Sequence, residues 1–133
     1  TGGVRSGLDE GDIEMGEILK IAPFNNRTVI YNMSVSEITS FLKVTGSGFY
    51  YSGLHIEQVG EEIHLLDEHD QLLQGETILT LGINDYIPAV HASHFPAKGE
   101  IQSMTAAETM IYYLENINSQ VDYADCNRYF RFQ

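Results

Sequence analysis

The stretch that decides the fold is TVIYNMSVSEITSFLKVTG, residues 28–46. Its first part, Thr28–Met33, is rich in β-branched and aromatic residues, which predicts a strand. Ser34 and Glu37 then form a capping box, in which each side chain can accept a hydrogen bond from the other residue's backbone N–H. Apolar residues follow at helical spacing, and Gly46 is a typical helix end. The stretch therefore predicts a strand that runs directly into a helix extending to about Thr45.

Further elements are predicted on both sides of this pair. A short helix is expected over Asp12–Lys20, ended by Pro23, and a second capping box, Thr105 with Glu108, begins a helix that extends to about Asn116. Strands are expected over Phe49–Gln58 with an interruption at Gly53, Glu62–Leu66, Thr77–Ile83 and Arg128–Phe132. Because strands gather in the middle and helices flank them, we predict an α+β domain with a mixed, largely antiparallel sheet.

Composition narrows the class of protein. A chain of 133 residues, 43% of them hydrophobic, fits a single domain over residues 1–133 with a core of its own. The chain is acidic, with a net charge of −12, and its 7 basic residues are scattered, which argues against a nucleic-acid polymer as partner. No apolar run approaches the ~20 residues of a membrane span. The single cysteine, Cys126, excludes a disulfide within the chain.

The N-terminal turn is a candidate anion site. Gly2 and Gly3 can bring backbone N–H groups close to a ligand, and Arg5 can add a forked, permanent positive charge. The alternative is that the glycines only make a turn and that Arg5 is a surface residue. Because the sequence begins abruptly at this turn, we expect a domain that is truncated at its N-terminal side.

A second candidate is the loop Ala22-Pro23-Phe24-Asn25-Asn26. The proline restricts the backbone just past a predicted helix, so the loop can present the Phe24 ring to a ligand. Aromatic rings stack on nucleobases with ~1–3 kcal/mol each. The alternative, that Phe24 fills the core, is equally compatible with the sequence.

No catalytic residue is nominated from the residues alone. The spacing of His91 and His94 supplies two potential zinc ligands where three or four are needed, so solvated loop histidines are expected. Asp67–Asp70 lacks the glycine of a calcium loop and is predicted to be a hairpin turn. No serine lies in a G-x-S-x-G motif.

Taken in order, these motifs resemble the C-terminal domain of the 5′-nucleotidase family. The chain carries counterparts of the family's motifs at similar spacing: GGVR (residues 2–5), LDEGDI (8–13), GEIL (16–19), APFNN (22–26), YSGL (51–54) and INDY (83–86). The similarity extends over nearly the whole chain and implies the fold of that domain.

The resemblance also implies a function. In the family this domain recognises a nucleotide or nucleoside, while an N-terminal metallophosphoesterase domain holds two divalent metals and hydrolyses the ester. By position, Arg5 falls on the arginine at the substrate phosphate and Phe24 on the ring that stacks on the base, with Gly2, Gly3 and Asn26 in the same motifs. The chain itself is expected to hold no metal or other cofactor and to be inactive without that domain or a partner subunit.

By the same resemblance, the expected context is nucleotide catabolism in the periplasm, outside the cell or at its surface. One departure bears on the site. The family's G-G-D-G-(F/Y) loop, which follows N-D-Y, is replaced by IPAVHASHFP at residues 87–96, so this loop must follow another path. Phe95 is the candidate for the second stacking ring, ahead of Tyr86. The alternative is an interaction or scaffold module that keeps the fold without nucleotide binding; an unrelated acidic binding domain is a third hypothesis.

Overall fold

The computed structural model describes residues 4–117, 119–122 and 128–133. Its elements follow one another in the order α1 (Met15–Ile21), β1 (Arg27–Ser34), α2 (Val35–Thr45), β2 (Phe49–Tyr50), β3 (His55–Val59), β4 (Glu62–Leu66), β5 (Ile78–Asn84), α3 (Tyr86–Val90), a 3₁₀ turn η1 (Ala92–His94), β6 (Glu100–Thr105), α4 (Ala106–Asn116) and β7 (Tyr129–Phe130). The fold is α+β, as predicted.

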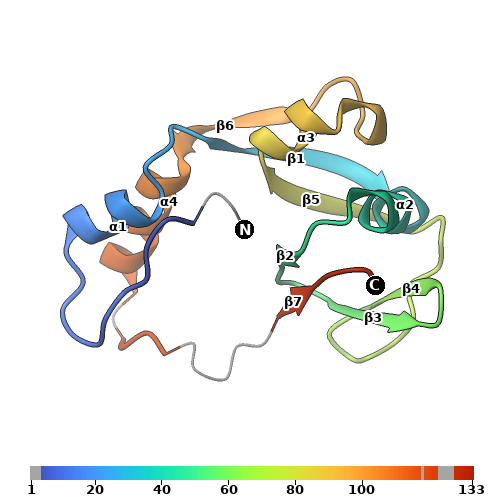
Figure 1. Ribbon diagram of the computed structural model, residues 1–133, viewed down its shortest axis with the longest axis horizontal. Helices are drawn as coiled ribbons and strands as arrows, with labels where there is room; N and C mark the ends of the chain where they lie inside the picture. The colour runs from blue at the N-terminus through green and yellow to red at the C-terminus, as the bar shows by residue number, and fades with distance from the viewer. Residues whose placement is uncertain (1–3, 118, 123–127) are drawn as a thin grey trace.

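The central sheet has three strands in the order β5-β1-β6 (Figure 1). Both pairings of β1 are antiparallel, and its side chains alternate between the core and the opposite face. Strand β6 was not predicted, because its sequence EIQSMT lacks the β-branched and aromatic enrichment of a strand. The pairing with β1 shifts register between Arg27 and Val29.

Both predicted capping boxes are present. The Ser34 hydroxyl accepts a hydrogen bond of 3.2 Å from the Glu37 backbone N–H, and the Glu37 carboxylate accepts one of 2.7 Å from the Ser34 N–H. Thr105 and Glu108 repeat the arrangement at the start of α4. In both pairs, the N–H of the first residue, assisted by its hydroxyl, lowers the pKa of the glutamate below its ordinary value of 4.5. Gly46 ends α2 with a φ of 58°, also as predicted.

The hydrophobic core lies between the inner face of the sheet, helix α2 and the β3–β4 hairpin. Met33 and Leu65 are fully buried at its centre, and Phe41 of α2 packs among them. The predicted hairpin turn is present: Asp67 Oδ1 accepts from the N–H groups of Gln71 and His69, which lowers the pKa of Asp67.

The predicted interruption of the Phe49–Gln58 strand around Gly53 is confirmed: Gly53 has a φ of 88°, and it lies between β2, which ends at Tyr50, and β3, which begins at His55. These belong to different two-stranded sheets, because β2 pairs with β7 and β3 pairs with β4. The described residues therefore form three small antiparallel sheets where one larger sheet was expected.

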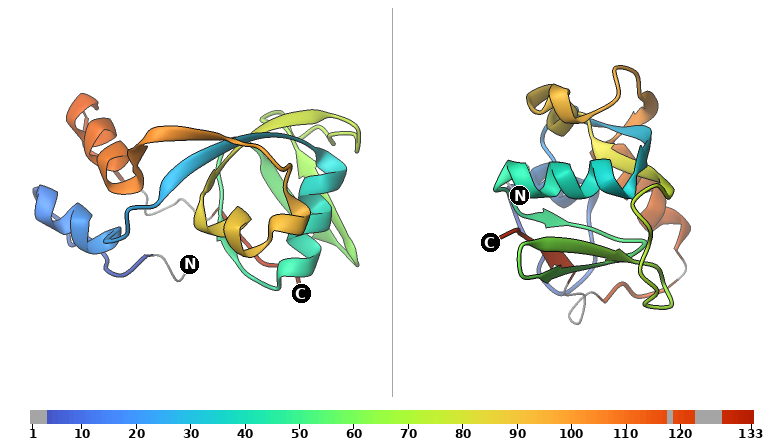
Figure 2. Two further views of the ribbon diagram at one scale, coloured as in Figure 1. Left: turned by 90° about the horizontal axis from the view of Figure 1, so that it is seen from above. Right: turned by 90° about the vertical axis from the view of Figure 1, so that its right-hand side faces the viewer.

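Helices α1 and α4 form a separate lobe. They lie side by side at the far end of β1 and β6, well away from α2 and the hairpin (Figures 1 and 2). Of the described residues in these two helices, only Ile18 and Ala107 are buried, and neither belongs to the main core. The helices of the described ranges are too short and too polar to cross a lipid bilayer.

Candidate functional site

Arg5 and Phe24 meet on the surface of the α1–α4 lobe. The guanidinium carbon of Arg5 lies over the Phe24 ring, 5.2 Å from its centroid. The Arg5 backbone N–H donates a hydrogen bond of 3.1 Å to the Ile21 carbonyl, which holds the N-terminal segment against the end of α1. Phe24 is 44% exposed, so the alternative of a core residue does not apply. The guanidinium is attracted to the ring face that it covers, and Phe24 remains partly accessible to solvent.

Local sequence places the Phe24 ring on the outside. The Glu14 N–H, just before α1, donates to the Glu17 carboxylate, and the helix ends at Ile21 with the Ala22 N–H bonded to the Ile18 carbonyl. Pro23 cannot continue a helical ladder because it lacks an N–H. The chain therefore leaves α1 at this point and carries Phe24 into solvent.

Asn26 holds the loop of Phe24 through hydrogen bonds to two other segments of the chain. Its side-chain amide donates a hydrogen bond of 2.8 Å to the Asp85 carboxylate, and its carbonyl accepts one of 2.8 Å from the Ala106 N–H. The Asp85 N–H in turn bonds the Arg27 carbonyl at 2.9 Å. Asn26 thus joins the loop after α1 to the end of β5 and the start of α4. Its amide is engaged within the protein, so its observed role is to position the loop.

The structure places Phe95 away from any stacking role. Its side chain is 8% exposed, and its ring centroid lies 4.9 Å from that of Phe41 and 5.3 Å from that of Tyr31. A ring enclosed in the core in this way has no face free for a base. Near it in sequence, Tyr86 is 62% exposed at the start of α3, where its N–H bonds the Asn84 side chain at 3.0 Å.

The segment that replaces the family's glycine-rich loop folds into α3 and η1, packed on the core. Pro88 is buried, and the rings of His91 and His94 approach Phe41 with centroids 5.7 and 6.4 Å apart. These histidines are half-buried packing residues, so the expectation of solvated histidines is corrected. Within the described ranges, no three His, Cys, Asp or Glu side chains converge in a way that could hold a metal ion.

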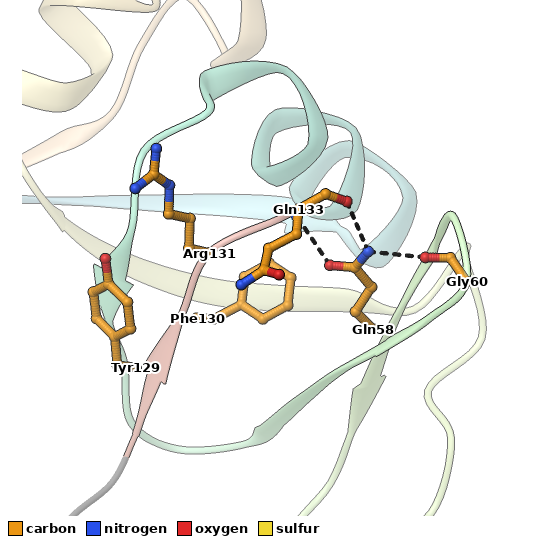
Figure 3. A pocket seen from close by; sticks show the side chains of 6 residues that line it. All are labelled: Gln58, Gly60, Tyr129, Phe130, Arg131 and Gln133. Carbon is orange, nitrogen blue, oxygen red and sulfur yellow. Dashed lines mark hydrogen bonds between the residues drawn. The ribbon is translucent and has the colours of Figure 1, made fainter.

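A cavity of about 470 Å³ lies beside β7, and Figure 3 shows its lining. The Gln58 amide donates to the carbonyls of Gly60 and Gln133, and its oxygen accepts from the Gln133 N–H at 3.1 Å. The Arg131 Nε donates to the Gly46 carbonyl at 3.1 Å. Gln58 therefore serves to fasten the end of the chain to β3 and leaves no amide group for a ligand.

Gly2 and Gly3 of the candidate anion site lie outside the described residues, as does Cys126. Arg5, Phe24 and Phe95 were expected to converge; Arg5 and Phe24 do, and Phe95 is buried in the core instead. The support given by Asp85 was not predicted, although Asn26 and Asp85 belong to the motifs APFNN and INDY that carry the family resemblance. Nothing local indicates that the two side chains meet.

Comparisons with known proteins place these motifs in a family. A family model described as 5′-nucleotidase, C-terminal domain, matches residues 1–100. Protein UshA of Yersinia enterocolitica is 38% identical over 56 residues, which are 42% of this chain and 10% of that protein. Trifunctional nucleotide phosphoesterase protein YfkN of Bacillus subtilis is 38% identical over 42 residues, 32% of this chain and 3% of that protein.

Among solved structures, a 5′-nucleotidase precursor from Thermus thermophilus shares the fold with a TM-score of 0.67 at 18% identity. The match covers 91% of this chain and 29% of that one. The chain therefore spans only a small part of each of these proteins.

Proposed function

The chain belongs to the family of 5′-nucleotidase C-terminal domains, and from that premise we propose that it is the nucleotide- or nucleoside-recognition domain of a 5′-nucleotidase-type phosphohydrolase. The observation that carries the proposal is the contact between Arg5 and the exposed ring of Phe24. The base stacks on Phe24, and the Arg5 guanidinium donates to a phosphate oxygen. Gly2 and Gly3 supply backbone N–H groups to the same anion.

Two physical features support this assignment. The hydrogen bond from Asn26 to Asp85 fixes the loop two residues after Phe24, so the ring meets a ligand without a large cost in loop ordering. Arg5 is held at its backbone by Ile21 while its side chain is exposed and can turn toward a phosphate. A guanidinium suits this task because it keeps its charge and donates in a forked geometry.

We assign hydrolysis of the phosphate ester to a separate domain or subunit. The described residues offer no group of side chains that fits a metal. By the family resemblance, a metallophosphoesterase domain or subunit would hold the divalent metals, and these would stabilise the attacking and leaving oxygens. The net charge of −12 makes unaided phosphate binding weak, so the metals contribute much of the attraction. A location in the periplasm, outside the cell or at its surface is proposed from the family resemblance, and fractionation of the source cells tests it.

A second candidate function is favoured by one observation. The segment over residues 87–96 is packed into the core through Pro88 and Phe95, so it offers no second ring to close over a base. An interaction module that has kept the fold and lost nucleotide binding would have this arrangement.

Calorimetric titration of the chain with AMP and with adenosine separates the two candidates. If the chain recognises nucleotides, both ligands should bind saturably. Phe24→Ala should lower the affinity for each ligand by about 5- to 150-fold, the equivalent of one stacking contact. Leu19→Ala is the matched control, because Leu19 is also an exposed apolar residue of this lobe, at 50%. Absence of binding to a panel of nucleosides and nucleotides, with or without Mg²⁺, would favour the interaction module.

A further inference from the structure

A groove of about 1230 Å³ lies in the α1–α4 lobe. Its lining comes from the segment before α1, from α1 and α4, and from residues 119–122. We refer to the part formed by residues 8–15 and 110–117 as the α1–α4 groove. It is distinct from the contact of Arg5 with Phe24, because neither of those residues lines it.

The α1–α4 groove has many apolar lining residues, and we call this part of its lining the floor. It includes Leu8, Ile13 and Met15 before and within α1, and Ile111, Leu114 and Ile117 in and just after α4. Leu8 and Ile13 are each 40% exposed, and Met15 is 58% exposed. Few side chains of this lobe are buried, so these apolar residues stay partly exposed to water. Contiguous apolar surface of this kind marks interaction sites.

The charged residues that line the groove are acidic, and we call them the rim. Asp9, Glu10, Asp12 and Glu14 come from the segment before α1, and Glu115 comes from α4. None of the described residues that line the groove is Lys, Arg or His. The carboxylates are spread along the rim and do not converge on a metal-binding position. Repulsion among them falls when a cationic partner lies between the two sides.

We propose that the α1–α4 groove is a docking site for a basic amphipathic helix of a partner protein or domain. Leucine-like side chains on one face of that helix fill the apolar floor, and Lys or Arg side chains along its flanks pair with the carboxylates of the rim. Helix-in-groove recognition of this kind uses apolar anchors at helical spacing. Charge complementarity selects this occupant: a second copy of the chain would bring two acidic rims together, and an anionic membrane would be repelled.

The probe is a synthetic amphipathic peptide of about four helical turns, with Leu at helical spacing and Lys elsewhere. We expect it to bind the chain saturably at about 0.15 M salt, with amide NMR shifts confined to residues 8–21 and 110–117. A peptide with Glu in place of Lys should not bind, and one with the same residues in a non-amphipathic order should bind at least tenfold more weakly.

Matched variants separate docking from general attraction to an acidic protein. Asp9→Asn, Asp12→Asn and Glu115→Gln together should weaken binding about tenfold, since each exposed ion pair contributes a factor of about 1.4 to 5. The control combines Glu57→Gln, Glu61→Gln and Glu76→Gln, which changes the net charge equally at exposed positions outside the groove, and should leave the affinity within twofold.

The apolar floor is tested in the same way. The double variant Leu8→Ser/Ile13→Ser should bind the peptide at least fivefold more weakly. The control variant Val44→Ser/Val59→Ser, at exposed positions elsewhere, should keep the affinity. Equal losses in the groove and control variants would overturn the proposal, as would NMR shifts spread over the whole surface. Concentration-dependent dimerisation with shifts at the groove would show that a second copy is the occupant.

Discussion

The side-chain amide of Asn26 donates a hydrogen bond of 2.8 Å to the carboxylate of Asp85, which is 59 positions away in the sequence. Asn26 precedes β1 and Asp85 follows β5, so the bond links the start of β1 to the end of the strand paired with it. It also fixes the loop that carries Phe24. The loop that carries the exposed ring is therefore held by a residue at the end of the neighbouring strand.

Removing either member of this pair should loosen the Phe24 loop. Asn26→Ala is expected to lower the free energy of unfolding by about 1–3 kcal/mol, because a partly buried carboxylate loses its donor. In a double-mutant cycle with Asp85→Ala, urea denaturation should give a coupling energy of about 0.5–3 kcal/mol. Asn25→Ala, at the exposed neighbouring position, is the control. Additive effects of Asn26→Ala and Asp85→Ala would show that the bond does not contribute.

The proposed role of Arg5 is specific to the phosphate. Arg5→Gln should lower the affinity for AMP by about 10-fold, which corresponds to the loss of a charge-assisted hydrogen bond. It should change the affinity for adenosine far less. The measurement is titration calorimetry with both ligands. Arg128→Gln is the matched control, because it removes the same charge at another exposed position. Equal loss of AMP and adenosine affinity in Arg5→Gln would contradict a phosphate contact.

Substitution of Phe95 should lower the stability of the fold far more than substitution of Tyr86. Phe95→Ala removes a ring that is 8% exposed and packed on Phe41, so we expect a loss of about 3–5 kcal/mol in unfolding free energy. Tyr86→Ala removes a 62% exposed ring and should change stability by no more than about 0.5 kcal/mol. Thermal or urea denaturation measures both. A small effect of Phe95→Ala would mean that the core does not depend on this ring.

The capping glutamates predict a loss of stability in acid. Folding lowers the pKa of Glu37 and of Glu108 below the ordinary value of 4.5, because the N–H and hydroxyl groups of Ser34 and Thr105 stabilise the charged carboxylates. Their contribution is therefore fully present above about pH 4.5 and disappears as the pH falls through the lowered pKa values.

The variant Glu37→Gln with Glu108→Gln should consequently show a shallower fall of melting temperature below pH 4.5 than the parent chain. Glu61→Gln with Glu76→Gln, which lie outside the capping boxes, is the control and should keep the parent slope. If both variants follow the parent, the capping carboxylates do not account for acid sensitivity.

Features that depend on near neighbours in the sequence were predicted well. The capping boxes at Ser34 and Thr105 and the helix end at Gly46 all follow from residues within one or two helical turns. Their hydrogen bonds and backbone restrictions are local, so the sequence specifies them directly.

The tertiary structure decided the rest, because it depends on which distant segments pack together. Strand β6 exists through its pairing with β1, and the two parts of Phe49–Gln58 belong to different sheets because they pair with β7 and with β4. The burial of Phe95 required a core to pack against, and the bond from Asn26 to Asp85 required the start of β1 to lie beside the end of β5. Side-chain chemistry alone made Phe95 and Phe24 equivalent candidates, and only packing showed that one ring belongs to the core while the other lies in solvent beside Arg5.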